Sequence, residues 1–82
     1  MLTEATKVRE LSFGEKAVGM TFNPGNNPEV DHIKGYCADI IEILNNARVN
    51  TTNNEKKRMY SEAITNIQTG QMWGVKAATW QY

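Results

Sequence analysis

Residues 27–50 read NPEVDHIKGYCADIIEILNNARVN, and this stretch decides the fold. Asn27 can cap the N-terminus of a helix, Pro28 suits the first helical position, and Glu29 is favourable near the positive end of the helix dipole. Apolar side chains then recur every three or four residues and form one stripe: Val30, Ile33, Cys37, Ile40, Ile41, Leu44 and Ala47. The spacing predicts a long helix over residues 27–50 that buries one face against another element.

A second long helix is expected directly after the first. The segment 51–54 (TTNN) has the composition of a turn, and Thr52 with Glu55 three residues later has the spacing of a capping box. The residues that follow carry a single facing stripe: Tyr60, Ala63, Ile64, Ile67 and Gln71. We therefore expect a helix over residues 52–81 that returns antiparallel to the first, because a short turn joins the two.

The first 26 residues are expected to hold a short helix and a loop. The helix is predicted over Leu2–Leu11, where apolar residues recur at every third position: Leu2, Ala5, Val8 and Leu11. Residues 12–29 contain both prolines and three of the six glycines, which predicts a loop with turns and space for one helical turn at Glu15–Val18. The sequence thus predicts one all-α helical-hairpin domain over residues 1–82, in which residues 1–26 precede helices 27–50 and 52–81.

The last third of the second predicted helix is apolar on both sides. One side is formed by Trp73, Ala77 and Trp80. The other side, nearly opposite at about 100° per residue, is formed by Ile67, Val75 and Ala78. The first long helix can cover only one side, so a second copy of the chain is the simplest cover for the tryptophans, and we expect a homo-oligomer. Gly70 and Gly74 add a flat strip where another backbone can approach.

Composition narrows the class of protein. The chain has 82 residues with nine basic and nine acidic side chains, so its formal net charge is zero. This balance disfavours binding to DNA or RNA polymers, which calls for a basic excess. No apolar run approaches the roughly 20 residues of a membrane span, and the N-terminal residues lack the apolar core of a secretory signal. The single cysteine, Cys37, allows no intrachain disulfide, which favours the cytoplasm.

The sequence contains no constellation typical of catalysis. The one histidine, His32, adjoins Asp31, but neighbours on a helix point about 100° apart and form a poor dyad. Cys37 lies on the apolar stripe, which is typical of a buried structural thiol. Glu29, Asp31 and His32 do not share a helix face, so they do not form a metal site. We therefore expect a protein that is not an enzyme and that uses neither a metal nor a cofactor.

A binding function is suggested by Phe22-Asn23-Pro24, in the loop before the first long helix, and by Lys34, about two turns into that helix. Lys34 lies off the centre of the apolar stripe, so its ammonium is expected to reach solvent or a ligand. An aromatic ring beside a cation suits a ligand that combines flat bases with phosphates. The alternative is a loop aromatic that closes the core beside a solvated lysine. Arg58, next to Lys56 and Lys57, is either part of a solvated face or a contact for phosphate.

Three further stretches carry a family resemblance: residues 13–24 (FGEKAVGMTFNP), 30–34 (VDHIK) and 71–80 (QMWGVKAATW). They resemble the helical-hairpin sponge proteins of phages, namely the anti-CBASS cyclic-oligonucleotide sponges and the hairpin domain that these share with a Thoeris anti-defence sponge. The resemblance implies a non-enzymatic protein, in the cytoplasm of the infected bacterial cell, that binds and sequesters cyclic di- and trinucleotide messengers. It also implies a homo-hexamer, with dinucleotide pockets between paired protomers and trinucleotide pockets where three protomers meet.

The resemblance also assigns residues to the two kinds of pocket. For cyclic dinucleotides it implies that Phe22, within Phe22-Asn23-Pro24, stacks on a base and that Lys34 meets phosphate. Phe13 is the substitute for the stacking ring, because the loop is shorter than in some members of the family. For cyclic trinucleotides, the implied residues are His32, Ile33 and Arg58.

A function of another class stays open beside the sponge. In this alternative the chain is a small helical module that docks on a protein partner through Trp73, Trp80 and Tyr82. The two hypotheses differ in what covers the tryptophans. A sponge of this family covers them with sister subunits, whereas a docking module leaves them exposed on a monomer until the partner arrives.

Overall fold

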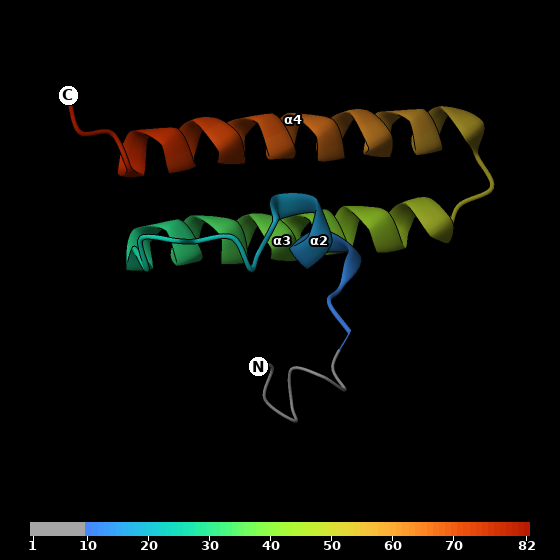
Figure 1. Cartoon of the computed structure of the whole chain (residues 1–82). Coiled ribbons are helices and arrows are strands. Elements are labelled where there is room, and N and C mark those ends of the chain that lie inside the picture. The colour runs from blue at the N-terminus through green and yellow to red at the C-terminus, as the bar shows by residue number, and fades with distance from the viewer. Residues whose placement is uncertain (1–9) are drawn as a thin grey trace.

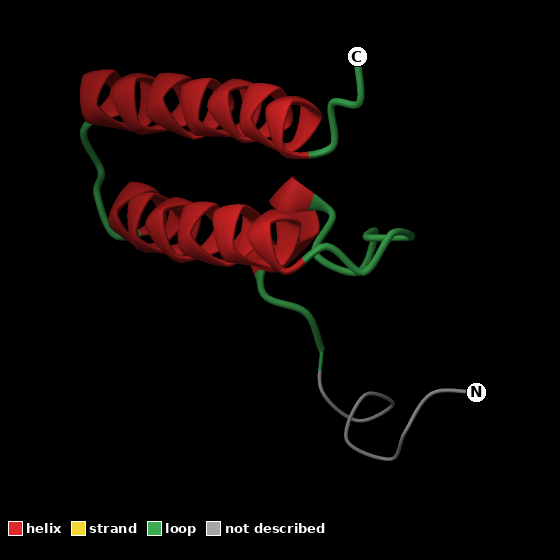
Figure 2. Cartoon of the chain, turned by 90° about the vertical axis from the view of Figure 1, so that its left-hand side faces the viewer, coloured by secondary structure: helices red, strands yellow, loops and turns green. Residues whose placement is uncertain are grey.

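The computed structural model describes residues 10–82 of the chain. It contains helices α2 (Phe13–Val18), α3 (Pro28–Val49) and α4 (Asn54–Ala78), and no strand among the described residues. Figures 1 and 2 show α3 and α4 side by side and antiparallel, with α2 packed mainly on α3. The predicted all-α hairpin is therefore confirmed. Most of the predicted helix at Leu2–Leu11 lies outside the described residues, and Glu10 and Leu11 are not helical.

The start of α3 follows the sequence prediction. The Asn27 side chain accepts a hydrogen bond from the backbone N–H of Glu29 at 2.9 Å, and Pro28 occupies the first helical position. Both features satisfy or remove backbone donors that the first turn cannot pair internally. The helix then runs to Val49, with Asn50 at its C-cap.

The start of α4 differs from the prediction. Asn53 is the N-cap, and its side chain accepts from the backbone N–H of Lys56 at 3.0 Å, so Thr52 forms no capping box with Glu55. Thr51 supports Asn53 as the N-cap, since the Thr51 hydroxyl accepts a hydrogen bond from the backbone N–H of Asn53 at 3.2 Å. The helix ends at Ala78, and Thr79 Oγ1 turns back to donate to the carbonyl of Val75 at 2.9 Å.

Helix α2 begins earlier than the single turn expected at Glu15–Val18. Ser12 and Glu15 form a capping box, in which Ser12 Oγ accepts from the Glu15 N–H at 3.1 Å and the Glu15 carboxylate accepts from the Ser12 N–H at 2.8 Å. Gly19 ends the helix in the left-handed conformation, with φ of +63°, which glycine adopts without steric cost. Helix α2 therefore ends after only six residues, and residues 20–27 form the loop that leads to the start of α3.

Helix α2 lies on α3 through a close backbone contact at Gly14. A Cβ atom at this position would lie 2.1 Å from the carbonyl oxygen of Ala38. The Gly14 N–H donates to the Glu42 carboxylate at 2.9 Å, which fixes the start of α2 on α3. From the other side, Gln68 of α4 donates to the Ala17 carbonyl at 3.1 Å.

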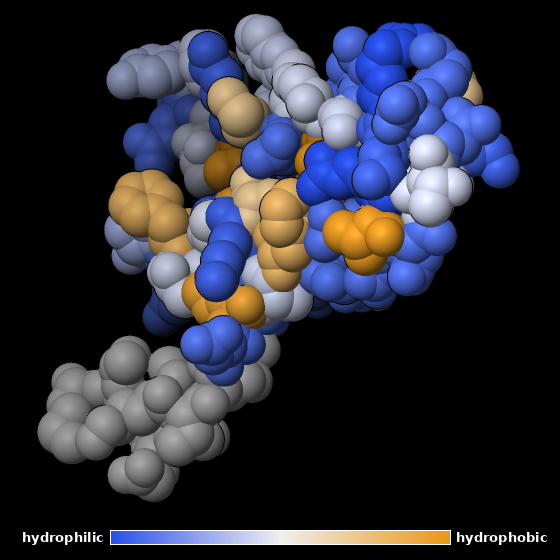
Figure 3. All heavy atoms as spheres, turned by 90° about the vertical axis from the view of Figure 1, so that its right-hand side faces the viewer, coloured by the Kyte–Doolittle hydropathy of each residue, from blue (hydrophilic) through white to orange (hydrophobic). Residues whose placement is uncertain are grey.

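The core forms where the three helices meet. Its buried members are Val18, Ala38, Ile41 and Ile64. The predicted α4 stripe is confirmed, with Ile64 and Gln71 buried. The predicted α3 stripe is wrong for Ile40, which is 45 % exposed, because α3 packs against α2 as well as α4 and its buried face is centred on Lys34, Ala38 and Ile41. Figure 3 looks at the turn end, where the start of α4 is largely hydrophilic and apolar residues form separate patches.

Candidate ligand-binding cleft

The loop between α2 and α3 is held in place by the side chain of Asn23. Its amide nitrogen donates to the Asn27 carbonyl at 2.8 Å and to the Asp31 carboxylate at 2.9 Å, while its oxygen accepts from the Asn27 N–H at 3.2 Å. The Asn23 side-chain amide thus makes these three hydrogen bonds within the loop and the first turn of α3. Asn23, predicted as part of the dinucleotide site, therefore tethers the loop to the first turn of α3.

Lys34 lies beneath the same loop. The residue is only 4 % exposed, and its Nζ donates to the Gly19 carbonyl at 2.9 Å and to the Phe22 carbonyl. The expectation that the ammonium reaches solvent is wrong, because α2 and its loop cover this side of α3. The carbonyl partners satisfy part of the hydrogen-bonding demand of a buried cation, as burial of a charged group requires.

The structure brings Phe22, and not Phe13, to Lys34. The Phe22 ring is 72 % exposed, and its centroid lies 5.6 Å from Lys34 Nζ. The ring of Phe13 instead lies 5.4 Å from the Arg48 guanidinium carbon. Arg48 is about 21 Å along the α3 axis from Lys34, at 1.5 Å per residue. Phe13 therefore cannot replace Phe22 as the ring at this place within one chain.

A cleft of about 520 Å³ opens between the loop, the start of α3 and the end of α4. Its lining combines two aromatic residues with aliphatic and polar ones, and consists of Phe22, Asn23, Pro24, Gly25, Asn27, Val30, Val75, Ala78, Thr79, Trp80 and Gln81. An amide bridge ties the two helix ends together, since Asn27 Nδ2 donates to the Ala78 carbonyl at 3.4 Å. The loop and the C-terminal end lie at the same end of the hairpin in Figures 1 and 2.

The sequence analysis did not predict that Trp80 lines this cleft. The antiparallel return of α4 brings the end of that helix beside the start of α3, and this was the signal that could have placed Trp80 in the same cleft as Phe22. The helical pattern instead assigned both tryptophans to one self-interface. The exposure of Trp80 therefore has a second explanation besides a self-interface. Phe22 and Trp80 are both more than half exposed, and both line the cleft.

The residues predicted for a trinucleotide site do not meet within one chain. His32 is exposed and lines a separate depression of about 260 Å³ with Tyr36 and Asp39. Ile33 faces α4, where its methyl groups lie 3.5 Å and 3.7 Å from the place of a Cβ on Gly74. Arg58 is about 24 Å along α4 from Gly74, at 1.5 Å per residue. A pocket that uses all three residues therefore needs Arg58 from another copy of the chain.

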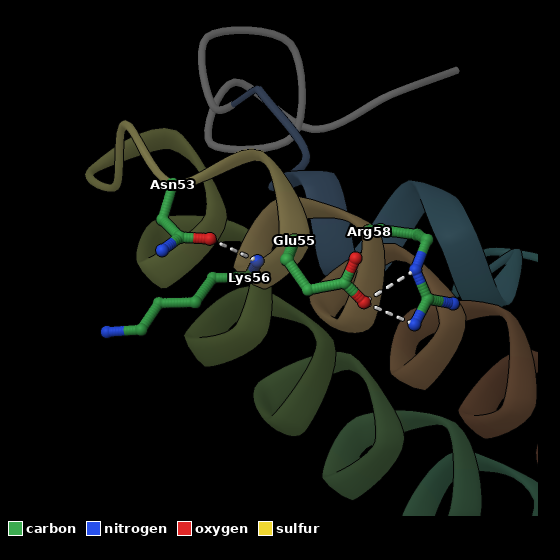
Figure 4. Close-up of polar contacts among 4 residues, drawn as sticks. All are labelled: Asn53, Glu55, Lys56 and Arg58. Carbon is green, nitrogen blue, oxygen red and sulfur yellow. Dashed lines mark hydrogen bonds and ion pairs between the residues drawn. The ribbon is translucent and has the colours of Figure 1, made fainter.

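Arg58 lies in the hydrophilic start of α4, and in Figure 4 the side chain of Glu55 lies between it and the Asn53 cap. Its guanidinium donates to the Glu55 carboxylate twice, from Nε at 2.9 Å and from Nη2 at 2.6 Å. The hydrogen bond to Glu55 raises the pKa of Arg58 above its ordinary value, while the small loss of hydration acts in the opposite direction. The side chain is exposed and charged, and it is oriented by its own helix.

The C-terminal end of α4 presents an aromatic surface formed by Trp73, Lys76, Trp80 and Tyr82. Lys76 Nζ lies over both indoles, 5.2 Å from the Trp73 centroid and 5.7 Å from the Trp80 centroid. The rings of Trp80 and Tyr82 meet edge to face at 5.4 Å. Both tryptophans are exposed in the single chain, whereas Val75 and Ala78 are half-buried. The helix was predicted to reach residue 81 but ends at Ala78, so Trp80 follows the helix and only Trp73 and Ala77 form the predicted outer side on α4 itself.

The depression lined by His32 also includes Tyr36 and the carboxylates of Glu15, Asp31 and Asp39, and Cys37 is not part of that lining. Burial raises the pKa of the Cys37 thiol, which lowers its thiolate fraction and therefore its reactivity at a given pH. Among residues 10–82, no three His, Cys, Asp or Glu side chains come together in a way that could hold a metal ion. Within the same part of the chain, no helix combines the length and apolar character needed to cross a bilayer.

These features define a small helical-hairpin protein with an open cleft at the end where its loop and C-terminus meet. Residues 15–79 match the family described as Acb2/Tad1, hairpin domain. The match covers most of the chain, so the protein belongs to this family, which comprises phage anti-CBASS and anti-Thoeris sponge proteins. It is a family of binding proteins, not known as enzymes. No curated protein and no solved structure matches the chain.

Proposed function

We propose that the protein is a non-enzymatic sponge that binds cyclic di- and trinucleotide second messengers of bacterial anti-phage defence and withholds them from their effectors. The observation that carries the proposal is the cleft of about 520 Å³, which is lined by two exposed aromatic residues, Phe22 on the tethered loop and Trp80 after the end of α4. Membership of the sponge family supports the same reading.

The cleft suits a ligand that carries flat bases. Stacking of a base on an aromatic side chain contributes about 1–3 kcal/mol and tolerates any base, because every base has a π-face. The loop is already ordered by the bonds of Asn23, so little conformational entropy is lost when a base stacks on Phe22. The nearest cation for which a contact to a cleft residue is known on α4 is Lys76, which is exposed and lies 5.7 Å from the Trp80 ring, in a neighbouring depression.

For cyclic trinucleotides we propose a second site, built from His32 and Ile33 of one copy and Arg58 of another. A homo-hexamer is the assembly proposed to bring them together. The exposed side chains at the end of α4 support such an assembly, because contiguous exposed apolar groups mark interaction surfaces. They include Met72, Trp73 and Trp80.

The test is a titration of the purified protein with a panel of cyclic di- and trinucleotides, followed by thermal unfolding. A ligand that binds only the folded state raises the midpoint temperature by mass action. The bound nucleotide is then released by heat and identified by mass spectrometry. Recovery of the intact ring supports a sponge. Linear products would identify a hydrolase, and the absence of any shift with the whole panel would overturn the proposal.

The second candidate function is a helical interaction module that docks on a protein through the C-terminal aromatic surface. The specific observation in its favour is the exposure of Trp73 and Trp80 in the single chain. Native mass spectrometry separates the two candidates. A monomer that binds no cyclic nucleotide favours the docking module, and a hexamer that binds one favours the sponge.

A further inference from the structure

We propose that the N-terminal segment, residues 1–9, covers an apolar face of α3 that the described helices leave open. The inference goes beyond the proposed function, because neither the cleft nor the proposed trinucleotide site includes this face. The family match begins at residue 15, so it does not account for the segment either.

The open face of α3 is formed by Tyr36, Ile40 and Ile43, which are 72 %, 45 % and 68 % exposed. Their spacing of four and three residues places them within about 60° of one another around the helix axis. Ala38, whose carbonyl meets Gly14 of α2, lies on the opposite side of α3, about 140° or more away. A contiguous apolar face on a helix marks a surface that another segment covers.

The described part of the chain begins beside this face. The Gly14 N–H donates to the carboxylate of Glu42, the residue before Ile43, so the start of α2 lies at the level of Ile43 along α3. In Figures 1 and 2 the residues that precede α2 leave the hairpin on the side of α3 that faces away from α4. Leu11 is half-buried there. The N-terminal segment therefore joins the hairpin within a quarter turn of the open face.

The length of the segment fits the face. Ile43 and Tyr36 are about 10 Å apart along the axis of α3, at 1.5 Å per residue. Nine residues span about 13 Å as a helix and up to about 30 Å when extended. The segment can therefore pass around α3 and run from Ile43 to Tyr36.

The segment also carries the side chains that such a contact needs. Leu2, Ala5 and Val8 recur at every third position and provide the apolar part. Lys7 and Arg9 lie on either side of Val8 and give the segment a basic excess, since it contains one acidic residue.

The flank of α3 beside the open face is acidic. Tyr36 lines a depression of about 260 Å³ together with Asp31 and Asp39. Pairs of opposite charge at a surface contribute little to stability, but they favour one orientation of a docked segment over others. Lys7 and Arg9 are the complementary charges on the segment.

The chain's own segment is favoured over a second copy as the occupant of the face. A short covalent connection gives the segment an effective concentration in the millimolar range at the face. A second copy reaches the face only at the concentration of the protein in solution. The two occupants differ in a way that labelling can detect.

The first test is a nuclear Overhauser experiment on the full chain, labelled at the methyl groups of Leu, Val and Ile. We expect cross-peaks from Leu2 or Val8 to Ile40 or Ile43. A sample mixed from two differently labelled preparations shows which chain supplies the segment, because a contact within one chain gives no cross-peak between the two labels. Absence of the cross-peaks, or their appearance between the two labels, would overturn the inference.

Thermal unfolding gives a second readout. We expect Val8→Ser to lower the midpoint temperature of the full chain by about 4 °C, since it removes a buried aliphatic side chain. In the Ile43→Ser background the same change should lower it by less than about 1 °C, because residues in contact are energetically coupled. Both residues can be changed without loss of the described core, of which neither is a part.

Val49→Ser is the matched control background. Val49 is 64 % exposed, and it lies about 120° from Ile43 around α3. Val8→Ser should therefore keep its full effect when Val49 is replaced. Equal shifts in the Ile43→Ser and Val49→Ser backgrounds would overturn the inference. Neither experiment uses a nucleotide, so the result does not depend on whether the proposed function is correct.

Discussion

Replacement of Gly14 by alanine tests how α2 is seated and, through α2, how the loop of the cleft is supported. The new Cβ would lie 2.1 Å from the carbonyl oxygen of Ala38, and 2.9 Å and 3.2 Å from its C and Cα atoms. All three are backbone atoms in the middle of α3, so no flexible side chain can move aside. We therefore expect Gly14→Ala to push α2 away from α3.

The cost follows from two contributions. Overpacking against a rigid neighbour costs about 1–3 kcal/mol. Displacement of α2 also lengthens the hydrogen bond from the Gly14 N–H to the Glu42 carboxylate, and loss of a bond to a charged group adds roughly 1.5–3 kcal/mol. We expect a total of about 2.5–6 kcal/mol, a large part of the stability of a domain this small.

Urea unfolding followed by circular dichroism measures this loss. The matched control is Gly35→Ala, which makes the same chemical change in α3 where nothing lies within 4 Å of the new Cβ. Alanine has the higher helix propensity, so the control should gain up to about 1 kcal/mol. If Gly14→Ala unfolds at the native urea concentration, α2 does not pack on α3 as described.

Three further predictions follow from the caps, the cleft and the thiol. Asn53→Ala should lower the unfolding free energy by about 1 kcal/mol, whereas Thr52→Ala should leave it nearly unchanged; equal losses in urea titrations would restore Thr52 as the cap. Phe22→Ala should weaken cyclic dinucleotide binding by about 1–3 kcal/mol in calorimetry without shifting the melting temperature, because the ring is exposed. Because burial raises its pKa, Cys37 should react with iodoacetamide more slowly than free cysteine at pH 8, and its rate should still rise with pH after free cysteine has levelled off; mass spectrometry that finds equal rates would contradict this assignment.

The long helices could be predicted from the sequence because local signals specify them. Asn27 and Pro28 mark the start of α3 unambiguously, and the apolar period of α4 identifies its inner face. The start of α4 was harder, since Thr52 and Asn53 are adjacent residues that can both cap. The turn decides between them through the bond from the Asn53 N–H to Thr51 Oγ1, which sequence spacing does not contain.

The candidate site was only partly predictable for a different reason. Phe22 was identified because an aromatic residue in a loop beside a helix start is a local feature. The burial of Lys34 depends on α2, which packs on α3 through a contact between Ala38 and Gly14, and Gly14 is 20 residues before Lys34 in the sequence. Trp80 joins the cleft through the antiparallel return of α4, and the helical pattern of α4 alone does not show which residues face the loop.

The central claim is that a cyclic dinucleotide binds in the cleft between Phe22 and Trp80. A nuclear magnetic resonance titration of the ¹⁵N-labelled protein with a cyclic dinucleotide tests it most directly. The account predicts saturable shifts concentrated in the amides of residues 19–27 and in the amide and indole N–H of Trp80. Shifts confined to the start of α4, or a spectrum that does not change at saturating ligand, would contradict it.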